Sequence, residues 1–428
     1  MKLKTSIIAG LLTMALVNPM PANAASCNVD RQLASNSILD LHAQVVNAET
    51  GEVLFSQDAD EPIRTASVLK LLTATVALDV LGPDHQIETK VYYSPRDPGK
   101  IFLVGAGDVT LSRMPAEITS YYAFGPKLDD LSEQVAIWAA QNGVTIDRVV
   151  TDSKLYGGSV GDWHSTWSKL GLSQGYMAPV SALQIDAGRL TNSKGNFIAK
   201  RTANPVKQAG KLFLESLKDS GVALNAKVFG GKLPADAVAI ASVKSRPMSE
   251  WVENMLRVSD NSLAEALGRV TSLAMGFDGS MGSLTETYKR VLGARGLDVS
   301  KISIVDASGL SRLNQVPAEL FTDLLLQIRS ENETSVIQGL PVAGKPGSLR
   351  NRFASGYKKA AIGKIIAKTG YIHSGYSLAG FITAKDGSEL AFSVFNLGTR
   401  VSAKHRVALD NLVYGLYKCG AKLDQSSI

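Results

Sequence analysis

The sequence has few of the residues that most often bind metal ions. Its 428 residues include two cysteines and five histidines, and no two histidines stand four positions apart. We therefore expect no metal site and no cofactor. Blocks of basic residues are also missing, and the formal net charge of +6 is spread along the chain. This pattern gives no reason to expect nucleic-acid binding.

Long apolar runs are confined to the N-terminus. Lys2 and Lys4 precede an apolar run over residues 7–17, and Ala22-Asn23-Ala24 follows it. This three-part pattern is typical of a secretory signal peptide, so we expect residues 1–24 to be removed near Ala24. The run is short for a membrane span, and no later stretch is long and apolar enough. The mature protein is therefore expected to be secreted, periplasmic or associated with the cell wall, with at most peripheral membrane contact.

The two cysteines, Cys27 and Cys419, stand near opposite ends of the mature chain. Export would place them in an oxidising compartment, so a disulfide between them is one interpretation. A second is lipidation of Cys27 as a new N-terminus, although the preceding Ala24-Ala25-Ser26 lacks a large aliphatic residue. Two separate buried thiols are a third.

The rest of the chain alternates between strand-like and helical patterns. Strands are expected at 41–47 and 52–56, followed by a helix from Ser67 to about Gly82. Residues 90–244 then read as a mixed α/β segment. After it come helices up to about residue 329, and the chain ends with strands at 362–369, 377–384 and 389–396 and a helix over 402–418.

Ser67-Val68-Leu69-Lys70 stands where the first long helix is expected to begin. Residues i and i+3 share one face of a helix, so Ser67 and Lys70 should point the same way. A lysine whose pKa is lowered can serve as the base that activates a serine hydroxyl. Taken alone, a Ser-x-x-Lys match is more often a helix start with a surface lysine.

Two further motifs change this assessment. Ser259-Asp260-Asn261 lies in a break between two expected helices, and Lys368-Thr369-Gly370 lies on an expected strand. The three motifs in this order resemble those of penicillin-binding proteins and serine β-lactamases. The long interval between Ser67 and Ser259, occupied by an α/β segment, is similar to that of the penicillin-binding protein 4-like D-Ala-D-Ala carboxypeptidases/endopeptidases, the S13 peptidases. Further similar stretches are 107–111, 161–183 and 306–312.

The resemblance implies an α/β (α+β) fold. It comprises a penicillin-binding domain with an antiparallel sheet flanked by helices, formed by 25–89 and 245–428, and an inserted smaller α/β domain, 90–244. It departs from the family in having Val109 where a proline is usual and in lacking room for a third small domain. The implied activity is that of a secreted serine D-Ala-D-Ala carboxypeptidase, with DD-endopeptidase activity as a second activity that the family name implies. Its implied partners are peptidoglycan stem peptides, with β-lactam antibiotics as covalent inhibitors.

Three residues are expected to carry the chemistry. Ser67 would be the nucleophile, and Lys70 the base, kept neutral by burial and neighbouring cations. Ser259 would pass a proton to the leaving amine. Ser67 and Tyr371 would supply the backbone N–H groups of an oxyanion hole.

Other residues are expected to bind substrate. Asn261 would hold the substrate amide and contact Lys70. Lys368, with a fixed positive charge, and Thr369 would hold the terminal carboxylate, and Gly370 would allow the peptide to approach the strand. By family resemblance, Asp152 and Arg312 would lie near the diamino acid of the stem peptide, although a solvated surface charge is an equal alternative for each.

Two other functions compete with this interpretation. A β-lactamase shares the acylation chemistry but needs a base for the deacylating water, and no Glu-x-x-Leu-Asn segment is present. A non-catalytic peptidoglycan-binding protein would have no need of all three motifs.

Overall fold

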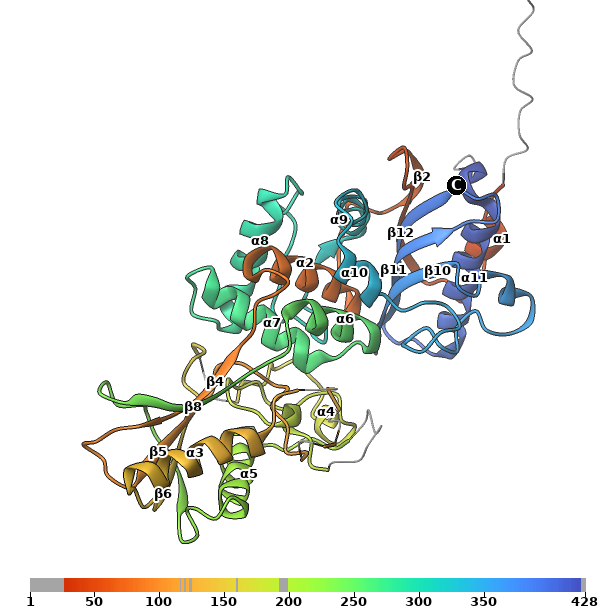
Figure 1. Ribbon diagram of the computed structural model, residues 1–428. Helices are drawn as coiled ribbons and strands as arrows, with labels where there is room; N and C mark the ends of the chain where they lie inside the picture. The colour runs from red at the N-terminus through yellow and green to blue at the C-terminus, as the bar shows by residue number, and fades with distance from the viewer. Residues whose placement is uncertain are drawn as a thin grey trace, which may run out of the picture.

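Two five-stranded sheets and a group of helices between them form the structure, a computed structural model (Figure 1). It describes residues 27–115, 117–118, 121–122, 125–158, 161–191 and 199–424. The expected signal peptide, residues 1–24, lies outside these residues. Within the described residues, no helix combines the length and the apolar character needed to cross a membrane.

The first sheet is antiparallel, in the order β10–β11–β12–β1–β2. Its strands come from both ends of the chain: β1 Asp40–Asn47, β2 Val53–Gln57, β10 Ile365–Ile372, β11 Gly375–Thr383 and β12 Glu389–Leu397. Side chains alternate between its faces, so Val394 joins a core with helix α11 (Ala403–Cys419), and Phe395 joins a core with helix α9 (Ala318–Ser330). A short helix, α1 (Asp30–Leu33), packs on α11.

A helical group joins this sheet to the rest of the molecule. Its members are α2 Lys70–Leu81, α6 Met248–Val258, α7 Asn261–Ala274, α8 Leu284–Ala294 and α10 Thr334–Gly339. Strands β3 (Pro62–Ile63) and β9 (Val316–Pro317) pair beside them. Helix α2 is buried on every side from Lys70 to Ala77, which agrees with its largely apolar sequence. It ends at Leu81 with Gly82 as its cap, where the sequence predicted its end.

The second sheet is mixed, in the order β7–β6–β5–β4–β8. Its strands are β4 Glu88–Tyr93, β5 Lys100–Val104, β6 Arg148–Asp152, β7 Lys227–Gly230 and β8 Val238–Lys244. Helices α3 (Leu128–Asn142) and α5 (Pro205–Asp219) pack together against it. Between β6 and α5 the chain forms long loops with a short helix, α4 (Leu170–Ser173), and these loops reach α7 (Figure 1).

The expected mixed α/β fold class is confirmed, and one predicted strand is displaced. The strand expected over 362–369 instead runs from Ile365 to Ile372, because residues 356–361 form a 3₁₀ turn and Gly363 has a positive φ of 75°. The second sheet is built from residues 88–244. The division of the chain into domains at 25–89, 90–244 and 245–428 stays a prediction.

Candidate active site

Ser67 and Lys70 stand at the start of helix α2. Ser67 lies in a 3₁₀ turn, Ala66–Leu69, in which residues three apart align. Lys70 Nζ therefore lies 3.0 Å from Ser67 Oγ, and it also lies 2.8 Å from Asn261 Oδ1 and 2.5 Å from the carbonyl oxygen of Ser308. Lys70 is fully buried, whereas Ser67 lines a cleft. The hydroxyl is thus accessible, with the amine directly behind it.

Strand β10 runs against the turn that carries Ser67. A Cβ atom on Gly370 would lie 3.2 Å from Ser67 N and would collide with Ser377 Oγ, so only glycine permits this approach. The adjacent Lys368 is fully buried, and its Nζ donates to Ser259 Oγ at 2.8 Å and to Thr369 O at 2.7 Å. The strand therefore brings the third motif to the first and second.

Ser259 occupies a sharp turn between α6 and α7. Its φ of 60° and ψ of 44° are left-handed, and it caps the end of α6. Asp260 caps the start of α7 by accepting from Leu263 N at 3.0 Å. This turn directs Ser259 toward Lys368 and Asn261 toward Lys70.

A buried carboxylate, Asp306, organises the loop behind Lys70. It accepts from Gly309 N at 2.7 Å, Ser311 N at 2.6 Å and Trp167 Nε1 at 2.7 Å. Gly309, with φ of 79°, packs so closely on the Ala66 carbonyl that a Cβ atom could not fit. The sequence had singled out residues 306–312 only by family resemblance, with no role for Asp306, whose contact with Trp167 joins segments that are far apart in the chain.

The cleft in front of Ser67 has a volume of about 1620 Å³. Ser259, Asn261, Thr369 and Gly370 line it, as do Tyr371 and Arg312, both exposed. On the C-terminal side of Lys368, the outer edge of β10 pairs with no further strand of the described chain. The cleft thus offers a free strand edge beside the nucleophile.

Asp152, by contrast, does not line this cleft. It ends strand β6, and its carboxylate accepts from Lys154 N at 3.0 Å and Leu233 N at 2.8 Å. The structure therefore shows Asp152 holding the backbone of the segments that follow strands β6 and β7. A contact with substrate stays a prediction from resemblance.

The sequence profile of the D-Ala-D-Ala carboxypeptidase 3 (S13) family matches residues 25–196 and 190–414. The chain belongs to the S13 family. The resemblance that the motifs indicated is thus confirmed, and with it the expected enzyme class, a serine-type D-Ala-D-Ala carboxypeptidase.

Relatives of this S13 enzyme match it over most of its length. Carboxypeptidase DacB of Mycolicibacterium smegmatis is 29% identical over 423 residues, covering 96% of this chain and 88% of that protein. The D-alanyl-D-alanine carboxypeptidase of Actinomadura sp. strain R39 is 31% identical, covering 83% of this chain and 77% of that protein. The crystal structure of penicillin-binding protein 4 from Haemophilus influenzae superposes with a TM-score of 0.73 at 20% identity, covering 89% and 97% of the two chains. That likeness shows that the fold is shared.

Burial is the main cause of the lowered pKa values of the two lysines in the S13 site. Burial lowers the pKa of Lys70 to about 8, while Asp306, Asp260 and Glu265 act in the opposite direction. The neighbouring charges with the largest effect on Lys70 are thus carboxylates, which raise its pKa, and not the cations that were expected to help lower it. An amine with this pKa is partly neutral near neutral pH, as a general base requires.

The pKa of Lys368 is also lowered by its surroundings. Burial, and to a smaller degree the nearby Lys70, holds the pKa of Lys368 well below its ordinary value. Burial thus makes Lys368 a weaker holder of its proton in the protein alone than an exposed lysine would be. A carboxylate beside Lys368 would raise this pKa again, since an opposite charge favours the charged form.

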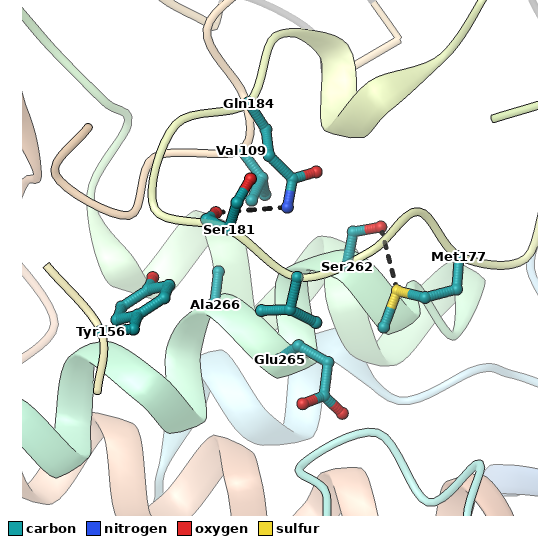
Figure 2. A pocket seen from close by; sticks show the side chains of 9 residues that line it. Val109, Tyr156, Met177, Ser181, Gln184, Ser262, Glu265 and Ala266 are labelled. Atoms are coloured by element: carbon teal, nitrogen blue, oxygen red, sulfur yellow. Dashed lines mark hydrogen bonds between the residues drawn. The ribbon is translucent and has the colours of Figure 1, made fainter. Parts of the chain in front are cut away.

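Glu265 is a second buried acid that sequence reasoning missed. Its Oε1 accepts from Ala307 N and Ser308 N, both at 3.0 Å, and burial raises its pKa to about 7. It thereby fixes the loop whose Ser308 carbonyl contacts Lys70. Figure 2 shows Glu265 on α7, in a small pocket between this helix and the loops that precede α5.

Proposed function

We propose that this S13 enzyme is exported and removes D-Ala from peptidoglycan stem peptides through an acyl-enzyme on Ser67, and that penicillins acylate the same serine. The observation that carries the proposal is the 3.0 Å contact between Lys70 Nζ and Ser67 Oγ in a buried setting. Burial supplies the base, because it lowers the pKa of Lys70 to about 8.

Neutral Lys70 accepts the Ser67 proton as Oγ attacks the carbonyl carbon of the penultimate D-Ala. The N–H groups of Ser67 and Tyr371 stabilise the oxyanion, and the close approach of Gly370 to Ser67 N supports this assignment. The C–N bond then breaks, and Ser259 relays a proton to the amine of the leaving D-Ala. Water hydrolyses the acyl-enzyme and regenerates Ser67.

The stem peptide lies along the free edge of β10 as an added strand. Lys368 and Thr369 hold its terminal carboxylate, and Asn261 holds its amide. Arg312, which lines the cleft, and Asp152 are assigned to the diamino acid, the second without a supporting contact. A DD-endopeptidase activity uses the same steps with a cross-linked stem peptide as the leaving group.

Export is proposed from the N-terminal pattern and supported by the Cys27–Cys419 disulfide, whose Cα atoms lie 5.3 Å apart. Disulfides persist in oxidising compartments such as the periplasm or the cell exterior. This pairing selects the first of the three interpretations of the cysteines.

The test is to incubate the mature protein with a fluorescent penicillin and follow the adduct by intact mass. A long-lived adduct that Ser67→Ala abolishes supports the proposal. Rapid turnover would indicate a β-lactamase, and no adduct would indicate a non-catalytic wall-binding protein. Ser165→Ala, an exposed serine that lines the same cleft, is the matched control and should be labelled normally. Mass analysis of products from purified muropeptides then separates release of D-Ala from cleavage of cross-links.

A further inference from the structure

The turn between α6 and α7 needs support from its surroundings. Ser259 adopts a left-handed conformation with φ of 60°, which is unfavourable for a residue with a side chain. Such conformations persist where neighbouring groups over-determine them. The groups that hold this turn therefore control where Ser259 and Asn261 point.

Asp260, the middle residue of this motif, is held from outside its own helices. Arg189 Nη2 lies 3.5 Å from Asp260 Oδ2, and Tyr122 donates to the same oxygen at 3.2 Å. Arg189 Nη1 also donates to the Tyr122 hydroxyl at 3.0 Å, and the guanidinium lies 3.5 Å above the ring centre of Tyr121. Asp260 and Arg189 are 4% and 3% exposed, so this ion pair is shielded from solvent.

Asn261 is held by the same part of the chain. Its Nδ2 donates to the carbonyl oxygen of Tyr176 at 3.1 Å. Arg201 Nε donates to the adjacent Gly175 carbonyl at 3.0 Å, and Arg201 pairs with Arg189 across an isolated antiparallel bridge. Arg189 thus contacts Asp260. Arg201 holds Gly175, the residue next to Tyr176, whose carbonyl oxygen accepts from Asn261.

Figure 2 shows further contacts between these loops and α7. Met177 and Gln184 from the loops approach α7, and Ser262 Oγ lies 3.7 Å from Met177 Sδ. The segment between β6 and α5 therefore packs directly on the first turns of α7.

We propose that Arg189 is a positioning residue for acylation. Through Asp260 it fixes the turn that directs Ser259 toward Lys368 and Asn261 toward Lys70, without touching substrate. This inference rests on the proposed function. The inference goes beyond that function in one respect: the segment between β6 and α5 contributes to catalysis by holding the Ser259-Asp260-Asn261 motif in place.

Energetics favour a geometric role for this pair. Removing two charges from water is costly, and apolar side chains of similar volume often stabilise a protein equally well or better. A buried arginine that forms its ion pair on the catalytic turn is therefore better explained by the geometry it imposes than by stability. Small misplacements of catalytic groups lower rates strongly, by about 100-fold for roughly 1 Å.

The chain offers a matched control. Arg269 lies on α7, is fully buried, and lies 3.2 Å from Asp162 of the loops between β6 and α5. It stands eight residues beyond Asn261, or about 12 Å along the helix. Both ion pairs join the loops to α7, but only the Arg189 pair contacts the catalytic turn.

The experiment compares Arg189→Met, Tyr122→Phe and Arg269→Met with wild type. Penicillin acylation and D-Ala release from a diacylated Lys-D-Ala-D-Ala peptide are measured per folded molecule, with folding checked by thermal unfolding. We expect Arg189→Met to lower the acylation rate and kcat by about 10- to 100-fold and to change KM much less, because the terminal carboxylate is bound by Lys368 and Thr369 on strand β10. Tyr122→Phe, which keeps the ring, should lose about 3- to 10-fold. Arg269→Met should stay within about twofold. The double variant Arg189→Met/Asp260→Asn should be no slower than Arg189→Met.

Two results would overturn the inference. One is an acylation rate of Arg189→Met that equals that of the wild type. If that variant does not fold, the same result for Tyr122→Phe has the same meaning. The other is an equal loss in Arg269→Met, which would show that any broken tie to α7 has this effect. If wild type itself is neither acylated nor releases D-Ala, the proposed function fails instead.

Discussion

The rate of Ser67 acylation should depend on pH through Lys70. Burial places the pKa of Lys70 at about 8 rather than its ordinary 10.5. About one molecule in 11 then has a neutral Lys70 at pH 7, and about one in 100 at pH 6. At saturating penicillin the acylation rate should therefore rise with pH, by up to about tenfold per pH unit, while Lys70 is mostly protonated, and should level off once Lys70 is neutral.

The saturating rate is the right quantity because Lys368 also titrates. In the protein alone its pKa is well below the ordinary value. The carboxylate of bound penicillin raises that pKa and keeps Lys368 charged, so the remaining pH dependence of the complex belongs to Lys70. Rapid-quench labelling with a fluorescent penicillin between pH 5.5 and 10 measures this rate.

Lys70→Arg is the matched control, since a guanidinium keeps the charge but does not lose its proton in this range. Its acylation should be strongly reduced at every pH. A midpoint near pH 10, a flat profile between pH 6 and 9, or an unchanged rise in Lys70→Arg would refute Lys70 as the base.

Three further predictions concern the groups around this centre. Gly309→Ala should destabilise the protein by about 1–3 kcal/mol or more and slow acylation, because its Cβ atom would meet the Ala66 carbonyl. Gly276→Ala, with φ of 82° and open space around it, is the control in thermal unfolding and should show only the cost of its backbone conformation. Lys368→Ala should slow acylation by carboxylate-bearing substrates about 10- to 100-fold, with little further loss for a substrate amidated at that carboxylate; equal losses for acid and amide would show that Lys368 does not recognise the carboxylate. Alkylation of the non-reduced protein should leave Cys27 and Cys419 unmodified, and replacing both by serine should cost about 2–5 kcal/mol of unfolding free energy.

Local rules were enough to predict the pairing of Ser67 with Lys70. A three-residue spacing at a helix start brings two side chains together in either an α-helix or a 3₁₀ turn, so the structure differs from the expectation only in the kind of turn. The end of α2 at Gly82 and the placement of Lys368 on a strand follow from equally local signals.

The supporting contacts could not be predicted in this way. Arg189 and Asp260 stand 71 positions apart, and no motif joins them. Asp306 collects donors from its own loop and from Trp167, which lies 139 positions earlier. Such contacts depend on how separate segments pack, and a single sequence carries no periodic or spacing signal for that.

The same packing explains why the prediction from the sequence that cations help to lower the pKa of Lys70 was wrong. Its buried carboxylate neighbours also hold backbone: Asp306 and Glu265 accept from the loop behind Lys70, and Asp260 caps α7. These acids raise the pKa of Lys70 while burial lowers it, and the balance of about 8 leaves the amine able to exchange a proton near neutral pH. A more exposed lysine would remain protonated, whereas a chain without these carboxylates would lose the loops that position the nucleophile. The groups that build the site and the groups that tune its base are therefore the same residues.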